Sequence, residues 1–201
     1  MARSPATDSA ALINAAAAVF KSKGYRNATI DDIADAAGVS RPTVYKYTQN
    51  KRALLDSMVD AVLDAITARL HEVLASTGPP AGKLRRLIAI HVETATSMQT
   101  FYGILFSEEA ELSDEARARF RSFSHAVAVD FQALLDDCVA AGAAARTIDT
   151  RIAAHLVLSM LTSLYRWYDP TGPTTPQQLE LQIAAVLGAL MPPDTGPKSR
   201  T

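Results

Sequence analysis

Residues 29–55 read TIDDIADAAGVSRPTVYKYTQNKRALL, and this stretch decides how the N-terminal part of the chain folds. Thr29 can cap a helix over residues 30–37, in which apolar residues recur at helical spacing. Gly38 can adopt a positive φ and reverse the chain. A second short helix then follows over residues 41–47. Two short helices joined by a three-residue turn form a helix-turn-helix, whose second helix enters the DNA major groove.

The second helix turns only Val44 firmly inward and leaves polar and aromatic side chains on its outer face. Its first residues can reach base edges, and its tyrosines and lysine can reach phosphates. Lys51 adds a cation at the start of the next helix, whose free N–H groups favour anions. The alternatives are core packing for the tyrosines, idle surface for the cations and a capping role alone for Thr29. The candidate DNA contacts are Thr29, Ser40, Arg41, Pro42, Thr43, Tyr45, Lys46, Tyr47 and Lys51.

The same stretch resembles the DNA-binding signature of the TetR family, the tetracycline-repressor-like regulators. Thr48 departs from that signature, because many members carry an aromatic residue there. The resemblance covers residues 8–60 and implies a small N-terminal DNA-binding domain, a larger helical ligand-binding domain and a homodimer. The matching residues are Gly24-Tyr25, Thr29, Ile33-Ala34, Gly38-Val39-Ser40, Thr43-Val44-Tyr45, Tyr47, Asn50-Lys51 and Ala53-Leu54-Leu55.

Composition and charge agree with a helical protein that has one basic end. The 201 residues include 36 alanines against nine glycines, which favours helices. Residues 1–55 carry eight Lys/Arg and four Asp/Glu, a net charge of +4, whereas the rest of the chain carries −5. A basic head on an acidic body suggests that only the head meets a polyanion, the alternative being an ordinary solvated surface.

Helical patterns continue to the end of the chain, interrupted by Gly- and Pro-rich breakers at residues 76–82 and 169–173. We therefore predict an all-α fold of about nine helices. The predicted helices after the motif cover residues 51–76, 83–107 as one helix or two, 113–141, 151–168 and 177–191. The predicted domains are residues 1–52, which bind DNA through a motif at about 29–48, residues 53–191, which bind ligand and dimerise, and a disordered tail at 192–201.

The last two predicted helices are apolar on more than one face, so other helices must cover them on every side. The cover is either the rest of the domain or a second copy, and the family resemblance favours a four-helix bundle between two copies. Two heads about 34–36 Å apart would read a two-fold symmetric site. With about three cations on each head, the logarithm of DNA affinity would fall with the logarithm of salt concentration with a slope near −5. Affinity would then drop roughly a thousandfold between 50 and 200 mM salt. The predicted interface residues are Leu156, Leu164, Trp167, Ile183, Leu187 and Leu190.

Aromatic residues on the middle helices are candidates for a ligand pocket, although plain core packing is the more common role for most of them individually. Residues 164–191 resemble the C-terminal helices of family members that respond to acyl-CoA thioesters or other lipid-derived ligands. The expected effector is therefore small and apolar. The predicted pocket residues are Met98, Phe101, Tyr102, Phe120, Phe123, His155 and Tyr165.

Several other classes of protein are disfavoured. The single cysteine, Cys138, excludes an internal disulfide framework, and the four histidines lack metal-ligand spacing, so we expect no metal or cofactor. We find no nucleophile elbow or glycine-rich phosphate loop and expect no enzyme. The longest uncharged stretches are 14 residues, against the ~20 that span a bilayer, and no signal-peptide core is visible, so we expect a cytoplasmic protein without membrane contact.

The sequence predicts a ligand-responsive, dimeric transcriptional regulator that binds a palindromic operator. We expect a repressor that a small apolar effector releases from double-stranded DNA. Two alternatives stay open. One is an architectural DNA-binding protein without an effector, and the other is a helical small-molecule-binding protein.

Overall fold

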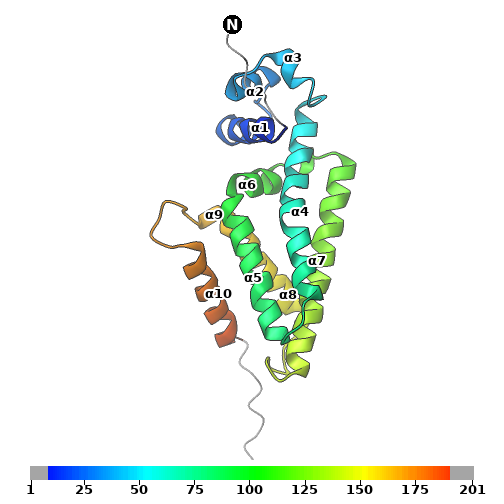
Figure 1. Cartoon of the computed structure of the whole chain (residues 1–201), viewed down its shortest axis with the longest axis vertical. Helices are drawn as coiled ribbons and strands as arrows, with labels where there is room; N and C mark the ends of the chain where they lie inside the picture. The colour runs from blue at the N-terminus through cyan, green and yellow to red at the C-terminus, as the bar shows by residue number, and fades with distance from the viewer. Residues whose placement is uncertain (1–8, 191–201) are drawn as a thin grey trace, which may run out of the picture. The chain divides into compact units, whose positions relative to one another are not determined.

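The computed structural model describes residues 9–190, with the backbone alone at residues 189 and 190, and every regular element in this range is a helix. The all-α prediction is confirmed. The predicted tail at 192–201 lies outside the described residues. The elements, shown in Figure 1, are α1 (Ser9–Lys23), α2 (Ile30–Ala37), α3 (Arg41–Val44), α4 (Lys51–Ala75), α5 (Pro80–Ser97), α6 (Gln99–Ser107), the 3-10 helix η1 (Glu109–Glu111), α7 (Asp114–Ala140), α8 (Thr150–Thr162), α9 (Leu164–Trp167) and α10 (Pro176–Leu190).

The helices form two compact units. Among the described residues, the first unit contains residues 9–64 and 98–121, and the second contains residues 65–97 and 122–190, so α4 and α7 contribute to both. The first unit extends beyond the predicted segment 1–52 because α6 packs on α1 and shares its core. A functional border at residue 52 stays a prediction.

Local signals fix the start and end of α2 as predicted. The Thr29 hydroxyl accepts a hydrogen bond from the Asp32 backbone N–H at 3.2 Å, and the Asp32 carboxylate accepts one from the Thr29 N–H at 3.0 Å. This reciprocal pair satisfies two donors that a helix start leaves free. At the other end, Gly38 has φ 66°, a left-handed conformation that costs glycine little.

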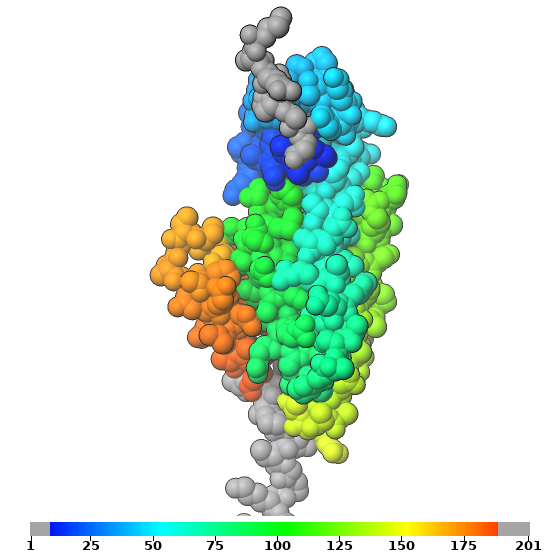
Figure 2. Space-filling model, in the orientation of Figure 1, coloured from blue at the N-terminus to red at the C-terminus, as the bar shows by residue number. Residues whose placement is uncertain are grey.

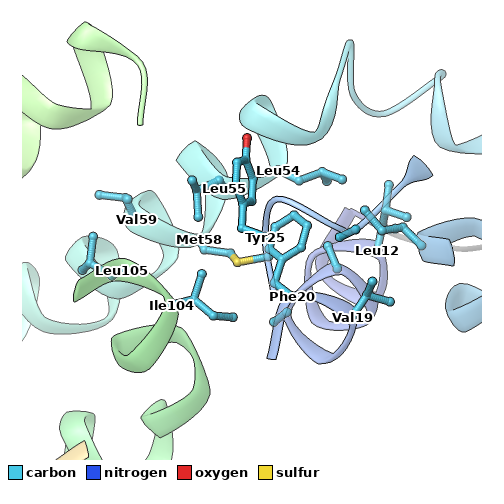
Figure 3. Packing of buried hydrophobic residues seen from close by; sticks show 14 of the residues in the cluster. Leu12, Val19, Phe20, Tyr25, Leu54, Leu55, Met58, Val59, Ile104 and Leu105 are labelled. Atoms are coloured by element: carbon cyan, nitrogen blue, oxygen red, sulfur yellow. The ribbon is translucent and has the colours of Figure 1, made fainter. Parts of the chain in front are cut away.

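The core of the first unit explains why α1, α4 and α6 lie together. Leu12, Ala16 and Phe20 form the predicted stripe on α1 and are all buried. Figure 3 shows side chains of α4, including Leu55 and Met58, pointing towards this stripe and towards α6. At ~25 cal/mol per Å² of apolar surface removed from water, this cluster is the main source of the unit's stability.

The third helix is shorter than predicted. Residues 41–47 were expected to be helical, but α3 ends at Val44 and the following residues form a turn. The Lys46 N–H bonds the Thr43 carbonyl at 3.1 Å and the Tyr47 N–H bonds the Val44 carbonyl at 3.0 Å, both tighter i→i−3 bonds. Successive β-branched and aromatic residues have low helix propensity, which accounts for the early end.

The predicted helix 151–168 is also divided. It forms α8 and the single turn α9, which meet at Ser163, whose hydroxyl donates to the Met160 carbonyl at 2.8 Å. A hydroxyl that bonds the preceding turn competes with the helical ladder. The predicted stretch 83–107 likewise forms two helices, α5 and α6, with Met98 between them.

Helix α5 is the central helix of the second unit. It contacts α8, α9 and α10, and Figure 2 shows α10 lying along α5. Most of its apolar residues are buried, among them Leu87, Ile88 and Val92, and His91 is buried with them. Across residues 9–190 no helix has the length and apolar content needed to span a bilayer.

Candidate nucleic-acid interface

Helix α3 and the turn after it present two tyrosines at the surface. Val44 is fully buried and anchors the helix on the core of the first unit. Tyr45 and Tyr47 are 46% and 48% exposed, so neither is the core aromatic that the sequence left open. The anchor thus fixes the outer face of α3, with one aromatic ring from its C-cap and one from the following turn.

The start of α3 is held by its own side chains. The Ser40 hydroxyl accepts a hydrogen bond from the Thr43 N–H at 3.4 Å and lies 2.8 Å from the Thr43 hydroxyl. Pro42 occupies the first turn, where its missing N–H costs nothing. The three residues thus form a preset helix start, in which the Thr43 N–H is already bonded to Ser40.

Arg41 is already paired in the protein alone. Its Nη1 lies 3.1 Å from a carboxylate oxygen of Asp31 on α2, and its guanidinium lies 5.7 Å from the centre of the Tyr45 ring. The hydrogen bond with Tyr45 and then the charge of Asp31 raise the pKa of Arg41. Solvent screens an exposed pair of this kind, so it contributes little to stability. DNA can therefore replace Asp31 at a small cost.

Lys51 is bound differently from the other cations. Its Nζ donates to the carbonyls of Tyr25, Arg26 and Ala28 at 2.8, 3.1 and 3.2 Å, and it lies 4.6 Å from the centre of the Tyr25 ring. An ammonium has three protons, and each has a carbonyl here. Lys51 therefore ties the loop between α1 and α2 to the start of α4, a role that the sequence reasoning missed. Its predicted phosphate contact stays a prediction.

Lys46 and Thr48 lie on opposite sides of the same turn. The side chain of Lys46 is exposed and, among the described residues, makes neither a hydrogen bond nor an ion pair. Thr48 is buried, and its hydroxyl donates to the Asn50 carbonyl at 2.9 Å, while the Asn50 side chain accepts from the Ala53 N–H at 3.0 Å. A hydrogen bond thus holds the chain where the resemblance led us to expect an aromatic ring.

Two family models match the chain in sequence. Residues 12–58 match "Bacterial regulatory proteins, tetR family", and residues 77–191 match "Tetracyclin repressor-like, C-terminal domain". The second match alone covers more than half of the chain.

The chain belongs to the TetR family.

Similar proteins agree with this TetR-family assignment. The chain is 27% identical over 184 residues to the HTH-type transcriptional repressor KstR2 of Mycobacterium tuberculosis, covering 89% of this chain and 90% of that protein. The solved structure of ketosteroid transcriptional regulator KstR2 of M. tuberculosis has a TM-score of 0.85 at 24% identity, and the match covers 92% of this chain and 95% of that one. AibR in complex with isovaleryl coenzyme A and operator DNA has a TM-score of 0.76 at 24% identity, covering 92% and 98%. At these identities the two structures establish the fold of this TetR-family chain.

The predicted pocket residues are divided between the two units. Met98, Phe101, Tyr102 and Phe120 lie in the first unit, where burial raises the pKa of Tyr102 to about 12. Phe123, His155 and Tyr165 lie in the second, and His155 is exposed. None of the seven lines the two cavities described in the second unit. Their role as a pocket stays a prediction.

The predicted interface residues also differ among themselves. Leu164 and Ile183 are buried inside the second unit, whereas Leu156 and Trp167 are 66% and 59% exposed. Leu187 lines both cavities of that unit, and the side chain of Leu190 lies outside the described residues. The structure adds exposed apolar residues that the sequence reasoning missed, namely Ile152, Leu181 and Val186.

A cavity of about 430 Å³ lies beside these residues, between α8 and α10. Ile152 and Leu156 of α8 and Val186 of α10 line it, so exposed apolar side chains surround an open depression. No group of three or more His, Cys, Asp or Glu residues that could hold a metal occurs within residues 9–190.

Proposed function

We propose that this TetR-family regulator is a dimeric repressor that a small acyl-CoA or other lipid-derived effector releases from a palindromic operator. The surface of α3 and of the turn after it carries the proposal, because Arg41, Tyr45 and Tyr47 are exposed there while buried Val44 holds the helix in place. We assign base contacts to Ser40, Arg41, Pro42 and Thr43 and phosphate contacts to Thr29, Tyr45, Lys46 and Tyr47. We assign no enzymatic activity to the chain and place it in the cytoplasm, where its DNA would be.

The exposed apolar faces of α8 and α10 support a dimer. Contiguous exposed apolar surface marks an interaction site in a soluble protein. Exposed Ile152, Leu156 and Val186 provide such surface where they line the 430 Å³ cavity, and Leu181 adds a further exposed apolar side chain on α10. In a two-fold arrangement the same patch of each copy covers that of the other.

The relatives support the class of effector. AibR, which shares this fold, has been crystallised with both isovaleryl coenzyme A and operator DNA, and KstR2 is named a ketosteroid regulator. Both names indicate an effector with an apolar body. An effector that binds one conformation of the dimer better than the other shifts the population away from the operator-bound form.

The experiment is selection of bound duplexes from a random pool, followed by titration of the selected site with isovaleryl-CoA and longer acyl-CoA thioesters. We expect a two-fold symmetric sequence and release by at least one thioester. Equal affinity for every duplex would support the architectural alternative. A specific site that no thioester releases would remove the proposed effector class.

Replacing Arg41 with alanine is expected to reduce operator affinity by ~1–3 kcal/mol and to relax preference at one base position of each half-site. Replacing Tyr47 with alanine is expected to weaken binding to every DNA sequence by the same factor, because a phosphate contact carries no information about the bases. Fluorescence anisotropy on single-base operator variants measures both effects. Equal losses on all operator variants for Arg41→Ala would contradict the base contact.

Replacing Leu156 with alanine is expected to raise the dimer dissociation constant about a hundredfold, since both copies lose the leucine and burying its extra methyl groups contributes about 1.4 kcal/mol in each. Sedimentation equilibrium measures the change. Val129→Ala is the matched control, because Val129 on α7 is 49% exposed and lies outside the proposed interface. An unchanged dissociation constant for Leu156→Ala would exclude this face from the dimer contact.

A further inference from the structure

A cleft of about 150 Å³ lies between α5, α7 and α10, and the link before α8 contributes to its wall. Residues 81, 84, 85 and 88 of α5 border it, and their helical spacing places them on one face of that helix. Residues 184, 187 and 188 of α10 border it in the same way. The cleft therefore lies entirely within the second unit and is formed by the packing of its helices.

The walls of this cleft are aliphatic. Four leucine and isoleucine side chains from three helices line it, and the other lining residues apart from Arg85 are Ala, Gly and Cys138. No aromatic side chain belongs to the lining. The four aliphatic residues are Leu84 and Ile88 of α5, Leu135 of α7 and Leu187 of α10.

Arg85 is the one charged residue of this lining. It is exposed, and within residues 9–190 its side chain makes no hydrogen bond or ion pair. No Asp or Glu lines the cleft. Burial and then Asp137 raise the pKa of Cys138, so the thiol in the wall is neutral. The guanidinium thus gives the solvent-facing edge of the cleft a positive charge that no lining group balances.

An aliphatic hollow with one cation at its edge suits a molecule that has an apolar body and one anionic end. Such a body loses contact with water when the cleft takes it up, which favours binding. A cavity of about 150 Å³ is large enough for a benzene-sized body. A guanidinium presents two parallel N–H groups, which match the two oxygens of a carboxylate. An ammonium group at the same place would be repelled by Arg85.

We propose that this cleft binds a small aliphatic carboxylate, whose hydrocarbon body lies between α5, α7 and α10 and whose carboxylate pairs with Arg85. The site goes beyond the proposed function, because it would bind this ligand whether or not a thioester releases the protein from DNA. Leu187 lines both this cleft and the 430 Å³ cavity on the proposed dimer face. A molecule in the cleft therefore packs against the helix that carries part of that face.

Cyclohexanecarboxylate and cyclohexanecarboxamide test this proposal, because they have nearly the same shape and only the first is charged at neutral pH. Methyl resonances of Ile88 and Leu135 should shift as the carboxylate is added, with a dissociation constant on the order of 1 mM. The amide should bind about fivefold more weakly, the upper effect of a solvent-exposed ion pair. Acetate has the charge without the body and should shift neither resonance in the same concentration range.

Arg85→Gln should weaken the carboxylate about fivefold and leave the amide unchanged. Arg86→Gln is the matched control, because Arg86 is exposed on the same helix and donates to the Ser76 hydroxyl at 3.0 Å without lining the cleft. It should bind both compounds as the original protein does. Gly188→Leu should weaken both compounds without lowering the melting temperature, since a Cβ at Gly188 meets no atom within 4 Å.

Equal binding of the carboxylate and the amide by the original protein would overturn the proposal. Equal losses in Arg85→Gln and Arg86→Gln would also overturn it, because they would indicate a general effect of surface charge. So would shifts confined to methyl groups of the first unit, or Ile88 shifts that persist unchanged in both Arg85→Gln and Gly188→Leu. These measurements need no DNA, so they can fail while the operator selection succeeds, and the reverse.

Discussion

Replacing Lys51 with methionine is expected to destabilise the first unit by about 2–4 kcal/mol. Methionine keeps an unbranched apolar stem but loses the ammonium that donates to three carbonyls between α1 and α2. Hydrogen bonds from a charged group contribute about 1.5–3 kcal/mol each, and the three share one group, so they do not add in full. Hydrogen exchange of the α1 and α2 amides measures the loss within this unit.

Lys46→Met is the matched control for this substitution. It removes the same charge from an exposed lysine whose side chain makes no hydrogen bond or ion pair among the described residues. Stability should therefore change by less than about 0.5 kcal/mol. Lys51→Arg should recover only part of the loss, because a planar guanidinium cannot direct protons to all three carbonyls. If Lys51→Met and Lys46→Met have the same stability and bind DNA with the same reduced affinity, Lys51 serves mainly as a phosphate contact.

Operator affinity is expected to fall roughly 150-fold between 50 and 200 mM salt, with a slope near −3.6. On each head exposed Lys46 contacts phosphates in the proposed complex, and Arg41 adds a second cation in the groove once DNA replaces Asp31, which gives four charges in a dimer. The sequence alone suggested six charges and a thousandfold loss, because it counted Lys51 as free. The bonds of Lys51 to three carbonyls reduce the count. Affinity measured by anisotropy at five or more salt concentrations gives the slope.

Lys46→Gln should reduce that slope by about 2, since it removes one phosphate contact from each copy. Arg151→Gln is the control, because Arg151 is an exposed cation on α8 and should leave the slope unchanged. A slope of −5 or steeper for the original protein would mean that Lys51 leaves its carbonyls when DNA binds. A slope near −2 would mean that only one head is bound.

Helix starts and turns could be predicted because their signals are local. Ser113, Asp149 and Thr175 each accept a hydrogen bond from the backbone N–H three residues on, at 3.1, 2.9 and 3.2 Å, as their places in the sequence suggested. Gly38 likewise reverses the chain as predicted. Each of these features depends on a few neighbouring residues and on the free groups at a helix end.

The contacts of Lys51 could not be predicted in this way. Its three acceptors lie 23 to 26 residues earlier in the chain and are backbone carbonyls, which leave no mark in the sequence. The faces of α8 and α10 could not be predicted either. Both helices are apolar nearly all round, so hydrophobic periodicity does not separate buried Ile183 from exposed Leu156.

The ion pair between Arg41 and Asp31 bears on how such a protein searches a chromosome. A genome presents millions of wrong duplexes, and each attracts an unpaired arginine as strongly as the right one does. Because Arg41 must leave Asp31 to bind DNA, its net binding free energy is that of the new contact less that of the ion pair. A contact with a DNA phosphate alone therefore gives a small net gain, and a contact with a guanine edge gives a larger one. The pair must be broken on right and wrong duplexes alike, so it lowers both affinities and shortens the residence time on each wrong duplex. The Asp31 carboxylate on α2 would thus shorten the time that the protein stays bound at each non-operator site.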